Sequence, residues 1–178
     1  MQTPWSEKPK APRLGAPLPL PISMAQLKGA SSMKRTADAR WSGDLRTGAG
    51  SISTASGALS NSPYTFKARF EDETGRSATN PEELLAAAHA ACFAMQLSHF
   101  LAEAGSPAAA LDVRAEVTVG PAPEGGGMAI SRSALSLRGD VPSMEKARFL
   151  ELADKAKANC PVSKALGAIE ITLDATLA

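Results

Sequence analysis

The stretch NPEELLAAAHAACFAMQLSHF, residues 80–100, decides the fold because it predicts one long apolar helix. Asn80 followed by Pro81 is a typical helix start, and the glycine and proline that follow Glu103 end the pattern. Six alanines between residues 86 and 94 make the helix narrow enough for a close neighbour. Apolar residues occupy nearly its whole circumference, which is typical of a central, buried helix.

The segments on either side of this helix alternate polar and apolar residues, which predicts β-strands. Strands are expected at residues 35–43, 50–56, 63–70, 111–120, 128–141 and 168–178. Two more helices are expected before the last strand, one capped by Ser143 and one opening at Pro161. This order predicts an α+β fold, with a largely antiparallel sheet around the long alanine-rich helix.

Composition and charge restrict the classes of function. Of 178 residues, 44% are hydrophobic, and 19 basic against 18 acidic residues leave a net charge of +1. Neither nucleic acid nor an anionic membrane is therefore an expected partner. No uninterrupted run reaches the roughly 20 apolar residues that span a bilayer. No glycine-rich phosphate-binding motif supports nucleotide binding.

The N-terminal segment differs from the rest of the chain. Six of the 13 prolines fall within residues 1–32, which predicts a flexible, extended N-terminal extension. Residues 33–178 are expected to form a single domain. The extension lacks the uninterrupted apolar stretch of an export signal, so a cytoplasmic protein is expected. Thiols are kept reduced in that compartment.

Only two cysteines occur, Cys92 within the long helix and Cys160 directly before Pro161. At a helix start Cys160 would face unpaired amides, which favour a thiolate, so by this argument it is the more acidic thiol. The residues alone leave three alternatives open. The thiols are inert packing groups in a non-enzymatic binding or scaffold protein, or they form a zinc site with His89 and His99, or they are a redox-active pair.

Three motifs carry a family resemblance: TNPEELLAAAHAACFAM, NCPVSKAL, and RWSGDLRTGAGSISTASG together with PYTFKARFE. From about residue 34 to the C-terminus the chain resembles the osmotically inducible protein C (OsmC) family. The resemblance implies an intertwined α+β homodimer with two active sites at the interface. It also implies a cysteine-based, peroxiredoxin-like peroxidase of the oxidative and osmotic stress response. Organic hydroperoxides would be its substrates, hydrogen peroxide would be reduced less well, and no metal, haem or flavin cofactor would be needed.

The same resemblance implies roles for four residues. Cys92 would attack the peroxide, and Cys160 would resolve the resulting sulfenic acid as a disulfide. Arg69, in YTFKARF, and Glu82, the first acidic residue of NPEEL, would form a charged pair at the thiol. A dithiol reductant, expected from relatives to be a lipoylated protein or another small dithiol, would then reduce the disulfide.

Helix geometry constrains this catalytic set. Glu82 and Cys92 are ten residues apart, which is about 15 Å along one continuous helix. Both cannot meet one guanidinium unless the helix breaks or a second chain supplies Glu82 in trans. Glu83 lies on the side of the helix opposite Cys92 and is expected to cap it. His89 and His99 are expected to pack or to form hydrogen bonds.

Overall fold

The computed structural model describes residues 32–178. The predicted N-terminal extension, residues 1–32, lies outside the described residues except for Ser32. In chain order the elements are β1 (Ala37–Ser42), β2 (Ala49–Thr54), β3 (Ser62–Thr65), α2 (Phe66–Phe70), α3 (Pro81–Glu103), β4 (Ala110–Pro121), β5 (Met128–Asp140), α4 (Lys146–Asn159), α5 (Pro161–Ala165) and β6 (Glu170–Leu177).

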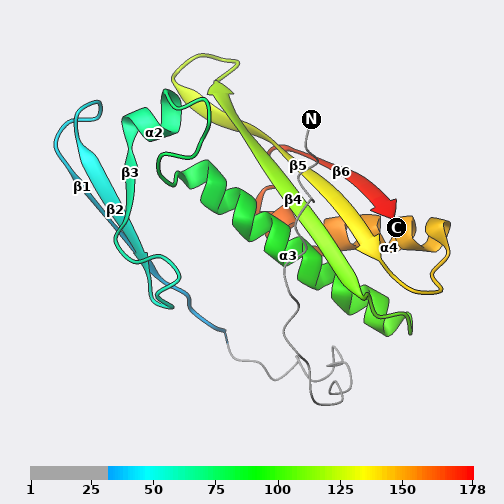
Figure 1. Cartoon of the computed structure of the whole chain (residues 1–178). Helices are drawn as coiled ribbons and strands as arrows, with labels where there is room; N and C mark the ends of the chain where they lie inside the picture. The colour runs from blue at the N-terminus through cyan, green and yellow to red at the C-terminus, as the bar shows by residue number, and fades with distance from the viewer. Residues whose placement is uncertain (1–31) are drawn as a thin grey trace. The chain divides into compact units, whose positions relative to one another are not determined.

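The strands β4, β5 and β6 form one sheet in that order, and α3 and α4 pack side by side against it (Figure 1). β4 and β5 are antiparallel, with one irregularity between Thr118 and Val119. β6 lies parallel to β5, because the helices α4 and α5 form the crossover between these two strands. Alternate residues of β5 face the helices, so Ser133, Leu135 and Leu137 are buried.

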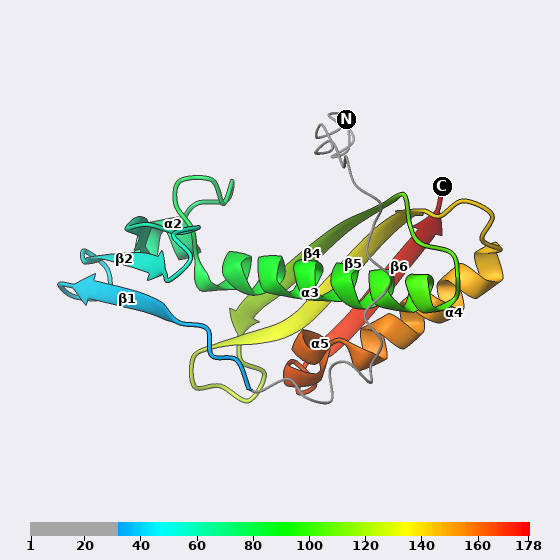
Figure 2. The same cartoon turned by 90° about the horizontal axis from the view of Figure 1, so that it is seen from below.

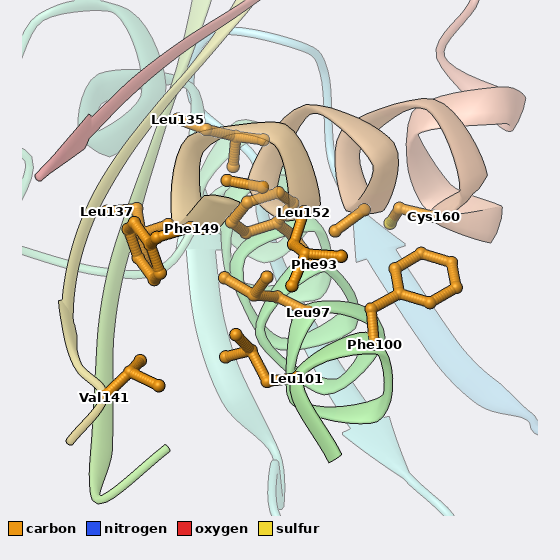
Figure 3. Packing of buried hydrophobic residues seen from close by; sticks show 12 residues of the cluster. Phe93, Leu97, Phe100, Leu101, Leu135, Leu137, Val141, Phe149, Leu152 and Cys160 are labelled. Carbon is orange, nitrogen blue, oxygen red and sulfur yellow. The ribbon is translucent and has the colours of Figure 1, made fainter. Parts of the chain in front are cut away.

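The core lies between this sheet and the two long helices (Figure 3). Phe93 and Leu97 on α3 and Phe149 on α4 are fully inaccessible to solvent, and burying a side chain of this size contributes about 1.5–3 kcal/mol. The Phe149 ring lies so close to Gly139 of β5 that any side chain there would overlap it. Cys160 belongs to the same buried cluster.

The helix α3 confirms the expected long helix. It runs from Pro81 to Glu103 without interruption, as the sequence predicts. The Asn80 side chain accepts a hydrogen bond from the Glu83 backbone N–H at 2.8 Å. The Glu83 carboxylate in turn accepts one from the Thr79 hydroxyl at 2.8 Å, so Glu83 helps to fix the helix start.

Only one side of α3 is buried in the chain, which corrects the expectation of a helix enclosed by the core. Ala88, Ala91 and Met95 form an exposed stripe on the other side, and Met95 is 74% exposed. By length and composition alone, α3 is also apolar enough to cross a membrane. Its buried side packs against β4 and α4, which identifies it as the central helix of this fold.

The strands β1, β2 and β3 form a second antiparallel sheet, beside the N-terminal end of α3 (Figure 2). The β1–β2 hairpin was expected from the sequence. In the middle of the sheet the Tyr64 ring covers Gly50 on the neighbouring strand and lies 5.3 Å from the Trp41 ring. No residue of these three strands is fully buried within the chain.

Two local predictions are wrong. The alternation over residues 63–70 predicts one strand, but the strand ends at Thr65 and the chain turns into α2. The Thr65 hydroxyl accepts a hydrogen bond from the Ala68 backbone N–H at 3.0 Å, which starts this short helix. Ser143 does not cap the helix that follows it. Its φ of 61° is left-handed, and α4 begins only at Lys146.

Candidate active site

The two cysteines, 68 positions apart in the sequence, lie next to each other. Cys92 comes from the middle of α3, and Cys160 stands where α4 ends and α5 begins. Cys160 is fully buried in the core cluster (Figure 3), and the partly exposed Cys92 packs against that cluster. Both are free thiols. The fold therefore brings together the two groups that a disulfide would join.

The surroundings of Cys92 act on its protonation in opposite directions. Burial raises the pKa of the Cys92 thiol, the backbone N–H of Val162 lowers it, and the adjacent Cys160 thiol raises it. The net effect is a pKa above the ordinary value for cysteine. Within one chain, Cys92 is thus a protonated thiol at neutral pH. A nearby cation would lower this pKa and favour the thiolate.

The start of α5 acts on Cys92 of the neighbouring helix. Cys160 is the N-cap residue of α5, but its side chain makes no cap hydrogen bond. The unpaired amide of Val162, in the first turn, instead acts on Cys92. The amide that the sequence places at Cys160 therefore also acts on the sulfur of the neighbouring helix, and the relative acidity of the two thiols stays a prediction.

A second polar group lies one helical turn away, at His89. Its Nδ1 lies 2.7 Å from the hydroxyl of Ser133 on β5, and its Nε2 lies 2.8 Å from the hydroxyl of Ser163 on α5. His89 and Ser133 are fully inaccessible and Ser163 is 6% exposed. Burial lowers the pKa of His89, so the ring is neutral at pH 7.

The histidines do not support the zinc alternative. Both ring nitrogens of His89 are already bound to serine hydroxyls. His99 Nε2 lies 3.4 Å from a Glu103 carboxylate oxygen without forming a hydrogen bond. Within residues 32–178 no three histidine, cysteine, aspartate or glutamate side chains converge in a way that would hold a metal ion.

Arg69 and Glu82 form a two-point ion pair within one chain. Arg69 Nε donates to Glu82 Oε2 at 3.1 Å, and Nη2 donates to Oε1 at 2.7 Å. The Glu82 side chain is only 9% exposed, and that of Arg69 is 35% exposed. The guanidinium also lies 4.7 Å from the centre of the Phe70 ring. The carboxylate and the aromatic ring together fix the orientation of the guanidinium.

The ion pair and the thiols are separate within one chain. The helix α3 is continuous between Glu82 and Cys92, so ten residues place them about 15 Å apart along its axis. The four residues named from the sequence are therefore brought together as two pairs, one of charges and one of thiols.

An apolar cavity of about 260 Å³ opens beside Arg69. Aromatic and aliphatic side chains dominate its lining, which consists of Trp41, Leu45, Tyr64, Thr65, Phe66, Arg69, Phe70 and Pro81. A larger cavity of about 690 Å³ borders the loop around Asp72 and Arg76. Its lining includes neither thiol and neither member of the ion pair, so its size alone does not make it the better candidate site.

Sequence reasoning missed the cluster of His89 with two serines. The sequence pattern predicts only that His89 packs or forms hydrogen bonds, and it assigns no role to Ser133 or Ser163. A signal was present in the spacing, because His89 precedes Cys92 by three residues and Ser163 follows Cys160 by three. Only the fold reveals that His89 lies against Ser163 and that Cys92 lies against Cys160.

Comparison with known proteins identifies the family. A model of the OsmC-like protein family matches residues 73–174. The chain belongs to the OsmC family. Among OsmC relatives, it is 46% identical over 143 residues to Peroxiredoxin OsmC of Escherichia coli (strain K12), covering 80% of this chain and 96% of that protein. It is 37% identical over 101 residues to the organic hydroperoxide resistance protein of Xanthomonas axonopodis pv. citri (strain 306), covering 56% and 68% respectively.

Solved OsmC-type structures have the same fold. The organic hydroperoxide resistance protein OhrB of Bacillus subtilis matches with a TM-score of 0.62 and 26% sequence identity, over 79% of this chain and 98% of that one. These likenesses confirm the family and the α+β fold class that the motifs predict.

Proposed function

We propose that this OsmC-family chain is a thiol-dependent peroxidase that reduces organic hydroperoxides through Cys92 and Cys160. One observation carries the proposal: the two cysteines of the chain, distant in sequence, lie side by side. Such convergence is expected of reacting partners rather than of independent packing residues. Relatives named peroxiredoxin and organic hydroperoxide resistance protein support the same function.

The first chemical step is the attack of the Cys92 thiolate on the O–O bond of a hydroperoxide. A bond forms between sulfur and one oxygen, the O–O bond breaks, and the departing alkoxide takes up a proton to become an alcohol. Cys92 is then a sulfenic acid. The Cys160 thiol attacks the oxidised sulfur, which forms a disulfide and releases water. Because Cys160 is adjacent, this closure competes with further oxidation of Cys92.

A dithiol completes the cycle. Thiol–disulfide exchange returns both cysteines to thiols while the dithiol becomes a disulfide. A lipoylated protein or another small dithiol has the required chemistry. Such a cycle needs a compartment that keeps thiols reduced, and we propose the cytoplasm.

Ionisation of Cys92 is assigned to Arg69 of a second copy of the chain. Burial raises the pKa of the Cys92 thiol, so attack at neutral pH requires a cation at the sulfur. The Arg69 guanidinium is oriented by Glu82, which is ten residues from Cys92 on the 23-residue helix α3 of the same chain. Ten residues rise about 15 Å, which is nearly half the length of this helix. A homodimer that places the ion pair of one protomer at the thiols of its partner resolves this conflict.

Two exposed surfaces support such a dimer. The sheet of β1, β2 and β3 has no fully buried residue on either face, although a small sheet needs packing partners to be stable. On α3 the stripe of Ala88, Ala91 and Met95 is also uncovered. Small side chains permit close approach of a second helix or sheet, so a second copy would bury both surfaces at once.

The apolar cavity beside Arg69 supports organic hydroperoxides as the preferred substrates. Its aromatic lining would bury an alkyl or aryl group, which contributes roughly 25 cal/mol for each Å² removed from water. Hydrogen peroxide has no such group and would gain nothing from this surface. In this arrangement the hydroperoxide end of the substrate lies at the guanidinium, which donates hydrogen bonds to its oxygens.

The proposal is tested by peroxide consumption with cumene, tert-butyl and hydrogen peroxides and a dithiol such as dihydrolipoamide. Wild-type protein should consume the organic peroxides faster than hydrogen peroxide. Cys92→Ser should abolish turnover, and Cys160→Ser should allow at most one turnover when recycling requires the disulfide. Full steady-state activity in Cys92→Ser would refute the assignment. Cysteines that resist alkylation and form no intrachain disulfide after peroxide treatment would favour a binding or scaffold protein.

The intersubunit arrangement is tested by mixing two inactive variants, Cys92→Ser and Arg69→Met. A heterodimer has two active sites. One site carries both substitutions, and the other has an intact thiol and an intact guanidinium. Co-refolded variants should therefore regain activity, up to about half of wild type per heterodimer, because one of its two sites is intact. Activity that does not return on mixing, with heterodimers verified by mass spectrometry, would show that each chain supplies its own arginine.

A further inference from the structure

The proposed chemistry does not use His89, although this residue joins the three elements that surround the thiols. It lies on α3, its two serine partners lie on β5 and α5, and all three residues are buried. Both hydrogen bonds are short, at 2.7 and 2.8 Å. Both ring nitrogens of this buried side chain are hydrogen-bonded, so removing either serine hydroxyl would leave one nitrogen unsatisfied and destabilise the protein. The cluster thus links α3, β5 and α5 inside the protein.

The element that most needs such an anchor is α5. It has only five residues, Pro161–Ala165, and a helix of this length has no stability of its own because nucleation is costly. Its first turn nevertheless carries two groups that act on the Cys92 sulfur, the Cys160 thiol and the Val162 amide. Their position relative to α3 depends on contacts that hold α5 in place.

The contacts between α3 and α5 come as two parallel pairs. On α3, His89 precedes Cys92 by three residues, so the two side chains lie one turn apart on neighbouring faces. On α5, Ser163 follows Cys160 by three residues. His89 contacts Ser163, and Cys92 contacts Cys160. Fixing the first pair therefore fixes the orientation of the second.

We propose that His89 is a positioning residue for the thiol pair. Through Ser163 it holds the first turn of α5 against α3, with the Val162 amide facing the Cys92 sulfur. The neutral ring accepts a hydrogen bond from one serine hydroxyl and donates one to the other, so β5 and α5 are tied to α3 by a single side chain. The role in peroxide reduction rests on the proposed function, but the positioning of the thiol does not.

The test measures the reactivity of the Cys92 thiol without peroxide. Reduced protein is alkylated with iodoacetamide over a range of pH, and mass spectrometry follows each cysteine peptide separately. Ser163→Ala removes one hydroxyl at the contact. Loss of one net hydrogen bond should lower the alkylation rate of Cys92 at neutral pH about five-fold and move its pH profile to higher pH. His89→Leu should give the same change or a larger one, and His89→Gln, which keeps a donor and an acceptor, should restore part of the wild-type rate.

Two controls separate positioning from general stability. His99→Leu changes the other histidine of α3, which is partly exposed and near the C-terminal end of the helix, and should leave the Cys92 profile unchanged. Thermal unfolding of every variant gives its stability. A Ser163→Ala protein that is less stable but has the wild-type Cys92 profile would overturn the proposal. If His89→Leu does not fold, Ser163→Ala and His89→Gln decide the question alone.

The outcome is independent of the proposed function. A wild-type protein that consumes no peroxide would refute the peroxidase, but its alkylation profile would still respond to Ser163→Ala if His89 positions the thiol. Active wild-type protein together with identical alkylation profiles in all variants would overturn the positioning role and leave the peroxidase in place.

Discussion

The ion pair of Arg69 and Glu82 gives the sharpest quantitative prediction. Glu82→Gln keeps the size of the side chain but removes the negative charge that Nε and Nη2 of Arg69 contact. Because hydrogen bonds to charged groups contribute about 1.5–3 kcal/mol and the Arg69 side chain is 35% exposed, we expect a loss of about 2 kcal/mol in the free energy of unfolding.

Arg69→Met should cost more. It leaves the carboxylate of Glu82, which is 9% exposed, without its cation. Breaking a fully buried pair costs about 3–5 kcal/mol, and the partial exposure of this pair sets the expected loss at the lower end, about 3 kcal/mol. The double variant should lose about 3 rather than about 5 kcal/mol, since no unpaired charge is left behind.

Urea denaturation at one fixed protein concentration measures these differences, because self-association would otherwise change the apparent stability. Arg148 and Glu151 provide a matched control. Their ion pair is also short, at 2.6 Å, but both side chains are about half exposed or more, so the same substitutions there should cost at most about 1 kcal/mol. Equal losses at the two pairs, or full additivity in the double variant, would refute the reasoning from burial.

Two further predictions concern the core. Gly139→Ala should destabilise the protein by about 1–3 kcal/mol, because its methyl group would overlap the Phe149 ring; an unchanged denaturation midpoint would contradict the packing described. The second concerns pH. Burial lowers the pKa of His89, so below its ordinary value of about 6.5 the unfolded chain takes up a proton that the folded chain does not. The stability from the neutral ring is complete above about pH 6.5 and is lost as pH falls toward the lowered pKa. The stability difference between wild type and His89→Gln should therefore narrow from pH 7.5 to 5.5, and a constant difference would argue against a buried neutral histidine.

Local sequence signals were sufficient for the longest elements. The cap at Asn80 and the stop after Glu103 fixed both ends of α3, and the period-2 alternation fixed β4 and β5 to within a residue or two. The same signals were insufficient where two patterns overlap. Residues 63–70 alternate like a strand, yet Thr65 is also a good N-cap, and the chain follows the cap.

Exposure and pairing depend on distant parts of the chain. The apolar circumference of α3 predicts burial on every side, but within one chain Ala88 and Met95 are exposed. The parallel pairing of β6 with β5 follows from the crossover through α4 and α5 rather than from the residues of the strand itself. Neither result can be read from a local pattern.

In the candidate site, too, some features are predicted from the sequence and others require the fold. The roles of Cys92 and Cys160 came from a family resemblance, since no spacing argument brings together residues 68 positions apart. The helix-start argument treats α5 alone, whereas in the fold α5 packs against α3 and the Val162 amide acts on Cys92. The His89 cluster required the fold.

The unequal exposure of the two cysteines also gives the reaction a direction. Cys160 is sealed in the core, whereas Cys92 keeps an opening to solvent. In the oxidised protein an incoming dithiol would meet only the outer sulfur, so the mixed intermediate would form on Cys92 and Cys160 would depart as the leaving thiol. In the proposed mechanism, oxidant and reductant would therefore both reach the bond at Cys92, and Cys160 would stay in the protein interior.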